Sequence, residues 1–448
     1  MKNNNNDNYL RKLMFGLETL VELDNKKRVP AINLDNAATT PPFKKVVGEI
    51  EDQLMYYGSI GRGKGQKSAH STEIYTKGRD IIKDFVGANS DIYTVFYTNN
   101  ATDGINKLAS ALIDDKEMIV LTTRMEHHAN DLSWRERAKT IFVDVDKKGR
   151  LDINHLKQLL QEYEGKVKYV SVTAASNVTG YVNDVHYIAK LTHKHGAKII
   201  VDGAQITAHR KFNMIGKTPE ESIDFFVFSA HKMYSPFGGG AVVGLAEVLN
   251  EHIPEFYGGG MVGAVCDNSL KYLNAPDSYE AGSPNYPGVV GMLKAIEVLQ
   301  CIGFNYIEDH EQNLLKRTIK GLKKCPEVIL YGDNEQINDR VGIIVFNVLG
   351  MKPEEVADYL AGQYAIAVRH AAFCAHPYVR RLTKNNESIE CSPPEGMVRI
   401  SFGIYNDEKD VDRFLDAAKS MIRRKSIKKL IGIRAKVKLL KDRPYDRG

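Results

Sequence analysis

The sequence predicts an α/β protein, with a mostly parallel sheet in a large domain and a smaller α+β domain after it. In the first two thirds of the chain, short apolar runs alternate with amphipathic segments of helical period. Strands that alternate with helices form parallel sheets covered on both faces, and such strands are nearly continuous in apolar residues. From about residue 295 the pattern changes, which indicates the second domain.

The strands of the large sheet are predicted at the apolar runs. In chain order these are "TVFYT" (94–98), "MIVLTT" (118–123), "TIFVDV" (140–145), "VKYVSVTAA" (167–175), "AKIIVD" (197–202) and "IDFFVFS" (223–229). Helices are expected between several of them, at 99–113 and at 182–196, where Gly196 forms the C-cap. The smaller domain is predicted from the helices at 292–303 and 354–364 and the strands "VGIIVFNV" (341–348) and "MVRISFG" (397–403).

Four regions follow from these patterns. Residues 1–30 are expected to form an N-terminal arm, partly disordered at its asparagine-rich start, with a short helix in "LRKLMFGLETLVEL" (10–23). The large domain spans 31–290, and the small C-terminal domain spans 291–420 and takes in an N-terminal segment. Residues 421–448 form a basic tail, which we interpret as a solvated helix with a frayed end or, alternatively, as a docking surface for a partner.

Composition narrows the class of protein. Of the 448 residues, 43% are hydrophobic and 26% are charged, and the net charge of +5 is too small to indicate nucleic-acid binding. The five cysteines form no CxxC pair, so free thiols in a reducing compartment are expected. The start "MKNNNNDNYLRK" lacks the apolar stretch of a signal peptide, and no run has the length of a membrane span. We therefore expect a cytoplasmic protein without membrane or nucleic-acid partners, and we predict no metal site.

Polar residues stand directly after the apolar runs, where the carboxyl ends of parallel strands hold ligands. They are Ala101, Thr102 and Asp103; Glu126, His127 and His128; Ser176 and Asn177; Asp202, Gly203, Ala204 and Gln205; and Ser229, Ala230, His231 and Lys232. The set contains a lysine for a Schiff base, a carboxylate for a pyridinium nitrogen, a histidine able to stack on a ring, and hydroxyls for a phosphate. These groups are what pyridoxal 5'-phosphate requires.

The stretch "FSAHKMYSPFGGG" (228–240) carries this lysine at the end of a buried strand. A lysine in such a place must pair, react or extend its ammonium toward water. The glycines after it predict that another group approaches the backbone closely.

The chain resembles the class V aminotransferase-fold enzymes, which have the type I fold of pyridoxal-phosphate-dependent transferases. Within them it is similar to the cysteine desulfurases of the sulfur-mobilisation type and to selenocysteine lyases. The resemblance runs from "INLDNAATT" (32–40) to "VRISFGIYNDEKDVDRF" (398–414). Between these it covers "MEHHANDLSW", "SNVTGYVND", "VDGAQ", "FSAHKMYSP", "YEAGSPN" and "AVRHAAFCAHP".

The resemblance implies a role for each residue around the cofactor. Lys232 would form the Schiff base, Asp202 would hold the pyridine nitrogen, and His127 would stack on the ring. The other cofactor contacts that it implies are Gln205 at the ring hydroxyl, Asn177, and the phosphate ligands Ala101 (through its backbone N–H), Thr102, Ser229 and His231. Ser283 would reach the phosphate of a partner subunit, which implies a homodimer with shared active sites.

The resemblance also implies the reaction. Arg399 would bind the carboxylate of an amino-acid substrate through two hydrogen bonds, with Asn177 and Arg369 nearby. Cys374 matches the cysteine that takes up the sulfur of L-cysteine as a persulfide, releases L-alanine and passes the sulfur to an acceptor protein. Lys232, Cys374 and His127 would be the catalytic residues. Around Cys374, Arg369, His370 and His376 could lower the pKa of the thiol.

The chain departs from the family pattern near the substrate sulfur. Gly61 and Gly65 stand where histidines are usual, "RHAAFCA" replaces "RTGHHCA", and the stretch from Cys374 to Arg399 is longer than in the most similar branch. Other reactions on the same scaffold therefore stay open: a C–S lyase on another thio-amino acid, a selenocysteine lyase, or an epimerase or aminotransferase. A non-catalytic scaffold role in sulfur transfer, with the basic tail for docking, is a further alternative.

Overall fold

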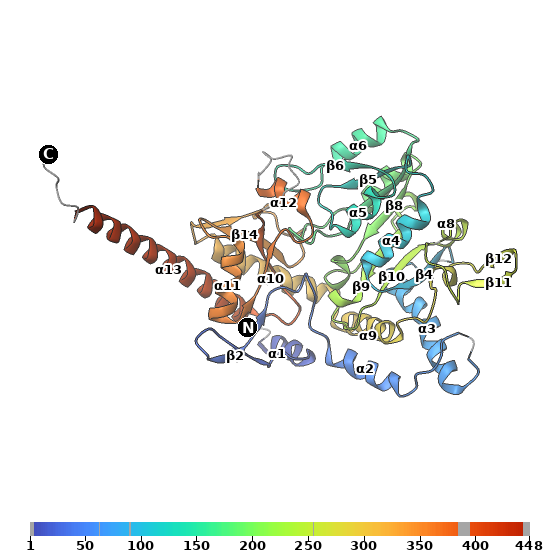
Figure 1. Ribbon diagram of the computed structural model, residues 1–448, viewed down its shortest axis with the longest axis horizontal. Coiled ribbons are helices and arrows are strands. Elements are labelled where there is room, and N and C mark those ends of the chain that lie inside the picture. Colours follow the sequence, from blue (N-terminus) through green and yellow to red (C-terminus); the bar gives the residue numbers. More distant parts are fainter. Residues whose placement is uncertain (1–3, 62, 89–90, 254, 384–394, 442–448) are drawn as a thin grey trace.

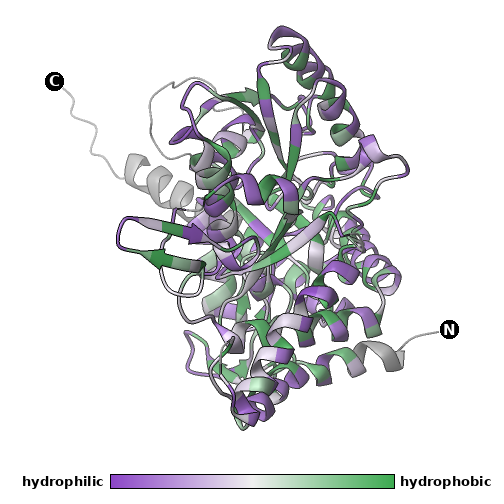
Figure 2. Cartoon of the chain, turned by 90° about the vertical axis from the view of Figure 1, so that its right-hand side faces the viewer, coloured by the Kyte–Doolittle hydropathy of each residue, from purple (hydrophilic) through white to green (hydrophobic). Residues whose placement is uncertain are grey.

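The computed structural model describes the chain except for residues 1–3, 62, 89–90, 254, 384–394 and 442–448, and it describes only the backbone of 4–8 and 425–441. A large body built around one sheet lies beside a smaller body, from which a long C-terminal helix projects (Figure 1). Hydrophobic residues are frequent on the strands, whereas many helices carry both hydrophobic and hydrophilic residues (Figure 2).

The large sheet has seven strands in the order β4-β10-β9-β8-β7-β5-β6. Their bounds are β4 (Tyr93–Thr98), β5 (Ile119–Thr123), β6 (Lys139–Val143), β7 (Val167–Thr173), β8 (Lys198–Asp202), β9 (Phe225–Ser229) and β10 (Gly240–Leu245). Within this sheet β10 alone runs antiparallel to its neighbours, so the predicted, mostly parallel sheet is confirmed. All six predicted strands are present. The strand β10 was not predicted because glycines interrupt its short apolar run.

Helices cover both faces of this sheet, as its buried strands require. Successive residues of β8 alternate between two cores: Ile199 and Val201 belong to one core cluster, and Ile200 belongs to the other. The helices of the large domain are α2 (Lys44–Leu54), α3 (Gln66–Phe85), α4 (Ala101–Leu112), α5 (Ala129–Arg135), α6 (Ile153–Glu162), α7 (Val185–Lys194), α8 (Ala246–Glu251) and α9 (Tyr286–Ile302). The predicted boundary between residues 290 and 291 falls inside α9, whose buried side chains belong to the core of the large domain.

The smaller domain contains an antiparallel sheet in the order β13-β14-β17-β16. These strands are β13 (Val328–Leu330), β14 (Ile343–Val348), β17 (Met397–Ser401) and β16 (Arg369–Ala371), and the helices are α10 (Phe304–Leu322), α11 (Pro353–Tyr364), α12 (His376–Thr383) and α13 (Glu408–Lys441). An N-terminal strand, β3 (Ile32–Asn33), pairs in parallel with β15 (Ile366–Ala367), so the N-terminal segment contacts this domain. The α+β pattern predicted from residue 295 onward is therefore present.

The N-terminal arm differs from the prediction. Its helix α1 (Asn4–Leu13) includes part of the asparagine run, and residues that were expected to be helical form the strand β1 (Leu20–Glu22), which pairs with β2 (Arg28–Pro30). The helix cannot continue into β1 because Gly16 has a φ of 78°, outside the right-handed helical region. The predicted helix over 10–23 is therefore wrong beyond Leu13.

The C-terminal region is a continuous helix. Helix α13 passes through the predicted boundary between residues 420 and 421 and extends away from the body of the protein (Figure 1). Within the described part of the chain, no single helix has the length and apolar character of a membrane span. The bent pair α9 and α10 reaches that threshold when its two helices are taken together.

Candidate active site

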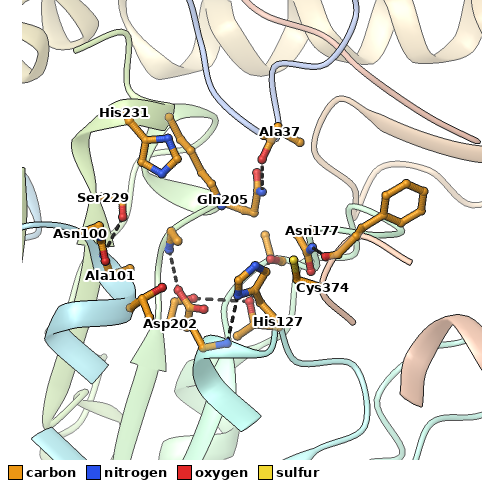
Figure 3. Close-up of a pocket in the computed structure, with 18 of the residues that line it drawn as sticks. Ala37, Asn100, Ala101, His127, Asn177, Asp202, Gln205, Ser229, His231 and Cys374 are labelled. Atoms are coloured by element: carbon orange, nitrogen blue, oxygen red, sulfur yellow. Dashed lines mark hydrogen bonds between the residues drawn. The ribbon is translucent and has the colours of Figure 1, made fainter. Parts of the chain in front are cut away.

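A cavity of about 530 Å³ lies at the carboxyl ends of the large-sheet strands, where the smaller domain and the N-terminal segment meet them. Twelve of the thirteen predicted site residues line it. These are Ala101, Thr102, His127, Asn177, Asp202, Gln205, Ser229, His231, Lys232, Arg369, Cys374 and Arg399. Figure 3 shows Ser229, His231 and the start of α4 on one side, Cys374 and Asn177 on the other, and Asp202 and His127 between them. The strand-end rule therefore located much of the wall that the large sheet contributes, whereas Arg369, Cys374 and Arg399 were implied by the family resemblance. The individual roles stay predictions.

Lys232 ends a short 3₁₀ turn, Ala230–Lys232, that follows β9 directly. Desolvation by the surrounding protein lowers the pKa of its amine to about 8, although the nearby carboxylate of Asp202 favours the charged form. Near neutral pH a sizeable fraction of this amine is unprotonated and can act as a nucleophile or base. Within the described part of the chain the lysine has no close ion-pair partner, and it lines the cavity.

The glycines after Lys232 pack against a helix. Gly239 has a φ of 117°, and a Cβ at this position would lie 2.9 Å from the carbonyl oxygen of Gly288, in the first turn of α9. The group predicted to approach the backbone here is therefore the backbone of α9.

Two buried carboxylates, Asp202 and Glu126, interact with each other at the strand ends, and Asp202 also interacts with the lysine. Asp202, at the end of β8, accepts a hydrogen bond from the backbone N–H of Ala204 at 2.9 Å, and burial raises the pKa of its carboxyl group. Glu126 accepts bonds from the side chain of Asn130 at 2.7 Å and from the backbone N–H of Thr173 at 3.1 Å. Burial, with a smaller contribution from Asp202, raises the pKa of Glu126 to about 8 despite these donors. The sequence placed Glu126 at a strand end but gave it no role.

Several groups in the cavity fit pyridoxal phosphate. Gln205 donates from Nε2 to the carbonyl oxygen of Ala37 at 2.9 Å, while its buried Oε1 has no partner among the described residues and can accept a ligand hydroxyl. Burial, followed by repulsion from Lys232, lowers the pKa of His127 to about 3, so its imidazole is neutral and can stack on an aromatic ring. The donors and acceptors present are those that the cofactor requires.

The start of helix α4 is suited to bind an anion. Asn100 caps the helix by accepting a bond from the backbone N–H of Asp103 at 2.9 Å. The backbone N–H of Ala101 donates to the hydroxyl of Ser229 at 2.6 Å, which brings β9 against the helix N-terminus. A helix N-terminus with a nearby hydroxyl is a common phosphate site. Burial lowers the pKa of His231 to about 4, so this imidazole is neutral as well.

The wall from the smaller domain carries Arg399, whose guanidinium is buried. Its Nη2 lies 2.9 Å from Oδ1 of Asp35, and its Nη1 donates to the carbonyl oxygen of Asn177 at 2.8 Å. Arg369 lies 3.8 Å from the other oxygen of Asp35, so this carboxylate lies between two cavity arginines. The buried Nε of Arg399 has no partner among the described residues and is left as a donor for a substrate. The expected pair of bonds to a substrate carboxylate must therefore share a guanidinium that Asp35 already binds, and no sequence pattern predicted this.

Cys374 lies on the loop between β16 and α12 and is exposed. The loop contacts the large domain through two carbonyl oxygens: Phe373 accepts a bond from Nδ2 of Asn177 at 2.7 Å, and Cys374 accepts one from the backbone N–H of His128 at 2.6 Å. Asn177 therefore holds the loop, a role that the sequence did not predict for it. His370 is exposed on β16, opposite Val398.

The remaining sequence expectations lie outside the cavity. Ser283 is exposed in a separate depression of about 110 Å³, and its assignment to a partner's phosphate stays a prediction. Gly61 and Gly65 lie near the start of α3 and do not line the cavity. The longer stretch after Cys374 begins as helix α12, but residues 384–394 within it, including Cys391, lie outside the described part of the chain.

Comparison with known proteins gives one consistent family. Residues 32–414 match the aminotransferase class-V family. A cysteine desulfurase of Haloferax volcanii is 32% identical over 87% of this chain and 88% of its own, and a probable cysteine desulfurase of Synechocystis sp. is 33% identical over 88% and 91%. Among solved structures, the apo cysteine desulfurase of Thermococcus onnurineus NA1 has a TM-score of 0.79 at 30% identity, covering 88% of this chain and 95% of that one. A cysteine desulfurase of Escherichia coli has a TM-score of 0.78 at 26% identity, covering 94% and 99%.

The raised pKa of Glu126 predicts how stability depends on pH. The folded state keeps the proton of this carboxyl group between its ordinary pKa near 4.5 and its raised value of about 8, whereas the unfolded state releases it. The free energy of unfolding should therefore fall as pH rises through this window, by up to about 1.4 kcal/mol per pH unit from this group. Urea unfolding of the wild type and Glu126→Gln from pH 5 to 8 measures this, and the free energy of unfolding of the wild type should fall relative to that of the variant as pH rises. A difference that is constant with pH would contradict the assignment.

Proposed function

Because the chain belongs to the class-V aminotransferase family, we propose that it is a pyridoxal-phosphate-dependent cysteine desulfurase that converts L-cysteine to L-alanine and holds the sulfur as a persulfide on Cys374. Its curated relatives and its structural neighbours are cysteine desulfurases. The observation that carries the proposal is that a lysine of lowered pKa and an exposed cysteine line the same cavity.

The cofactor would be held by the residues that already face the cavity. Asp202 would bind the pyridine nitrogen, Gln205 the ring hydroxyl, and His127 the ring face. The phosphate would lie at the N-terminus of α4, with Ala101, Thr102, Ser229 and His231 as its contacts. When bound, pyridoxal phosphate supplies an aldehyde carbon that reacts with amines and a ring that takes up electrons when a bond to the substrate Cα breaks.

The protein's own groups perform binding and proton transfer. Arg399 binds the carboxylate of L-cysteine and so orients its Cα toward Lys232. Lys232, with a pKa of about 8, removes the proton from Cα and can return it, because its neutral and charged forms are both populated near pH 7 to 8. The carboxylate of Asp202 is buried and interacts electrostatically with Lys232, so it favours a positive charge at this end of the sheet.

Cys374 performs the sulfur step. Its thiolate attacks the sulfur of the substrate, an S–S bond forms, and the C–S bond breaks. The carbon skeleton takes up a proton and leaves as alanine, and a persulfide stays on the loop for an acceptor protein. The loop that carries Cys374 is anchored to the large domain by Asn177 and His128, so the thiol stays at the cavity.

A second reaction class stays a candidate because of one observation. The positions before Cys374 hold Ala372 and Phe373, and the ring of Phe373 packs under the guanidinium of Arg399 at 5.0 Å. An apolar ring at this place suits a larger thio-amino acid. A C–S lyase acting on such a substrate would use Lys232 in the same way and would not need Cys374.

The experiment that tests the function measures alanine and sulfide from L-cysteine with a thiol reductant. The wild type should form both in equal amounts. Cys374→Ala should keep the visible absorbance of the bound cofactor but lose alanine formation by at least about 10³-fold, because the nucleophile is gone. Cys391→Ala is the matched control and should stay within about twofold. Equal losses in both variants would contradict the choice of thiol, and unchanged activity in Cys374→Ala would favour the lyase.

We also propose a homodimer with shared active sites. The strands β11 (Val262–Cys266) and β12 (Ser269–Tyr272) form a hairpin that projects from the large domain (Figure 1). The hairpin exposes 69% of Val265 and 54% of Leu270, an apolar surface typical of subunit contacts. The loop before it is bonded to the segment that carries Ser283, since the backbone N–H of Gly282 donates to Gly259 at 2.8 Å.

Light scattering should give twice the mass of the chain for the wild type at micromolar concentration. The double variant Val265→Lys, Leu270→Lys should shift the protein toward the monomer, because charges replace the apolar contact surface. A monomeric wild type would contradict the proposal.

A cytoplasmic location is also proposed, because the four described cysteines are free thiols; cell fractionation tests it.

A further inference from the structure

His128 contacts the chain at Cys374 and at His376, two residues further on. Its backbone N–H donates to the carbonyl oxygen of Cys374 at 2.6 Å, and its Nε2 accepts a bond from the backbone N–H of His376 at 3.3 Å. The two imidazole rings of His128 and His376 meet edge to face, with their centroids 4.7 Å apart. One residue of the large domain therefore holds the turn from Cys374 to His376 from both ends.

This turn needs an external anchor because its backbone is strained. Ala371, Phe373 and Cys374 have φ values of 85°, 52° and 55°, a region that residues with a Cβ seldom adopt. Each such residue costs about 1 kcal/mol or more and persists only when surrounding contacts enforce it. Asn177 holds the carbonyl oxygen of Phe373, but the contacts on Cys374 and His376 come from His128.

His128 also connects the turn to the centre of the cavity. The preceding residue, His127, lines the cavity, and its Nδ1 accepts a bond from the backbone N–H of Ala129 at 3.1 Å. Helix α5 begins at Ala129, so both histidines directly precede the same helix. The imidazole of His127 lines the cavity predicted to hold the cofactor, and the imidazole of the next residue, His128, contacts the loop that carries Cys374. Because the two histidines are adjacent in the chain, the distance between the cavity and this loop is constrained.

We propose that His128 is a positioning residue for Cys374, whose Nε2 holds the cysteine turn in the left-handed conformation that keeps the thiol at the cavity. The proposal rests on the proposed function for its effect on activity, but the hold on the turn can be measured without it. An imidazole nitrogen can accept this bond only when it carries no proton. The neutral form with the proton on Nδ1 is thus the form that holds Cys374.

The charged surroundings of His128 favour this neutral form. Burial lowers the pKa of His128, repulsion from His376 lowers it further, and Arg135 on α5 adds to this, while Asp131 on the same helix opposes it. Burial and the nearby Arg380 on α12 lower the pKa of His376. The bond is therefore present at neutral pH and is lost as pH falls through the lowered pKa of His128, below the ordinary value of 6.5.

Two substitutions separate positioning from simple packing. His128→Gln places an oxygen acceptor close to the place of Nε2 and cannot be protonated, whereas His128→Phe keeps the ring without an acceptor. His70→Phe, on α3, is the matched control, because His70 bonds to Gln53 in another part of the large domain. The readouts are the pH profile of kcat/KM for L-cysteine, the visible absorbance of the cofactor, and the rate at which iodoacetamide alkylates Cys374, followed peptide by peptide in protein with and without cofactor.

We expect His128→Phe to keep the cofactor absorbance, to lower kcat/KM by about 10- to 100-fold, and to make alkylation of Cys374 several-fold faster. His128→Gln should keep kcat/KM within about fivefold and lose the acid limb of the wild-type profile; His70→Phe should match the wild type. Two outcomes would overturn the proposal. In the first, His128→Phe and His128→Gln both match the wild type in kcat/KM and in the alkylation rate of Cys374. In the second, both variants lose kcat/KM to the same extent and both keep the acid limb of the pH profile. A wild type that leaves cysteine untouched would refute the proposed function alone, since the alkylation rates still test the hold on Cys374.

Discussion

Ionisable groups buried between the carboxyl edge of the large sheet and the smaller domain are the constraint on which the site depends. Asp202, Glu126 and Arg399 are almost completely shielded from water, and the amine of Lys232 lies among them. Holding such a group in its charged form away from water costs several kcal/mol, which only a well-packed surrounding structure can offset. The two cores on either face of the large sheet supply that structure, and the shifted pKa values of Lys232 and His127 follow directly from it. The burial that costs free energy also lowers the pKa of Lys232, as the proposed covalent chemistry requires.

The site is completed across the junction between the two domains. Arg399 and Cys374 come from the smaller domain, and each is bonded to a residue of the large one: Arg399 to Asn177, and Cys374 to His128. Asp35, from the N-terminal segment, holds both cavity arginines. The proposed substrate binding and sulfur transfer would therefore depend on contacts between segments that are distant in the sequence. A change at this junction would move the thiol relative to the lysine without altering either residue.

Much of this arrangement could be predicted from the sequence because buried parallel strands leave a strong apolar signal and their carboxyl ends converge. That logic located Lys232, Asp202 and the start of α4. It could not find Asp35 or the roles of His128 and Glu126, because those depend on which segments meet in three dimensions. The strand β10 was not predicted because glycines interrupt its apolar run. The N-terminal helix was predicted to extend too far because the helical period of "LRKLMFGLETLVEL" does not reveal that Gly16 has a positive φ.

The most direct test of the account is to find where the sulfur goes. The purified protein would be mixed with L-cysteine in the absence of reductant, digested, and its five cysteine-containing regions compared by mass spectrometry. One additional sulfur atom is expected on the peptide that contains Cys374, formed together with alanine. Alanine formed without sulfur on this peptide, or sulfur found mainly on another cysteine, would contradict it.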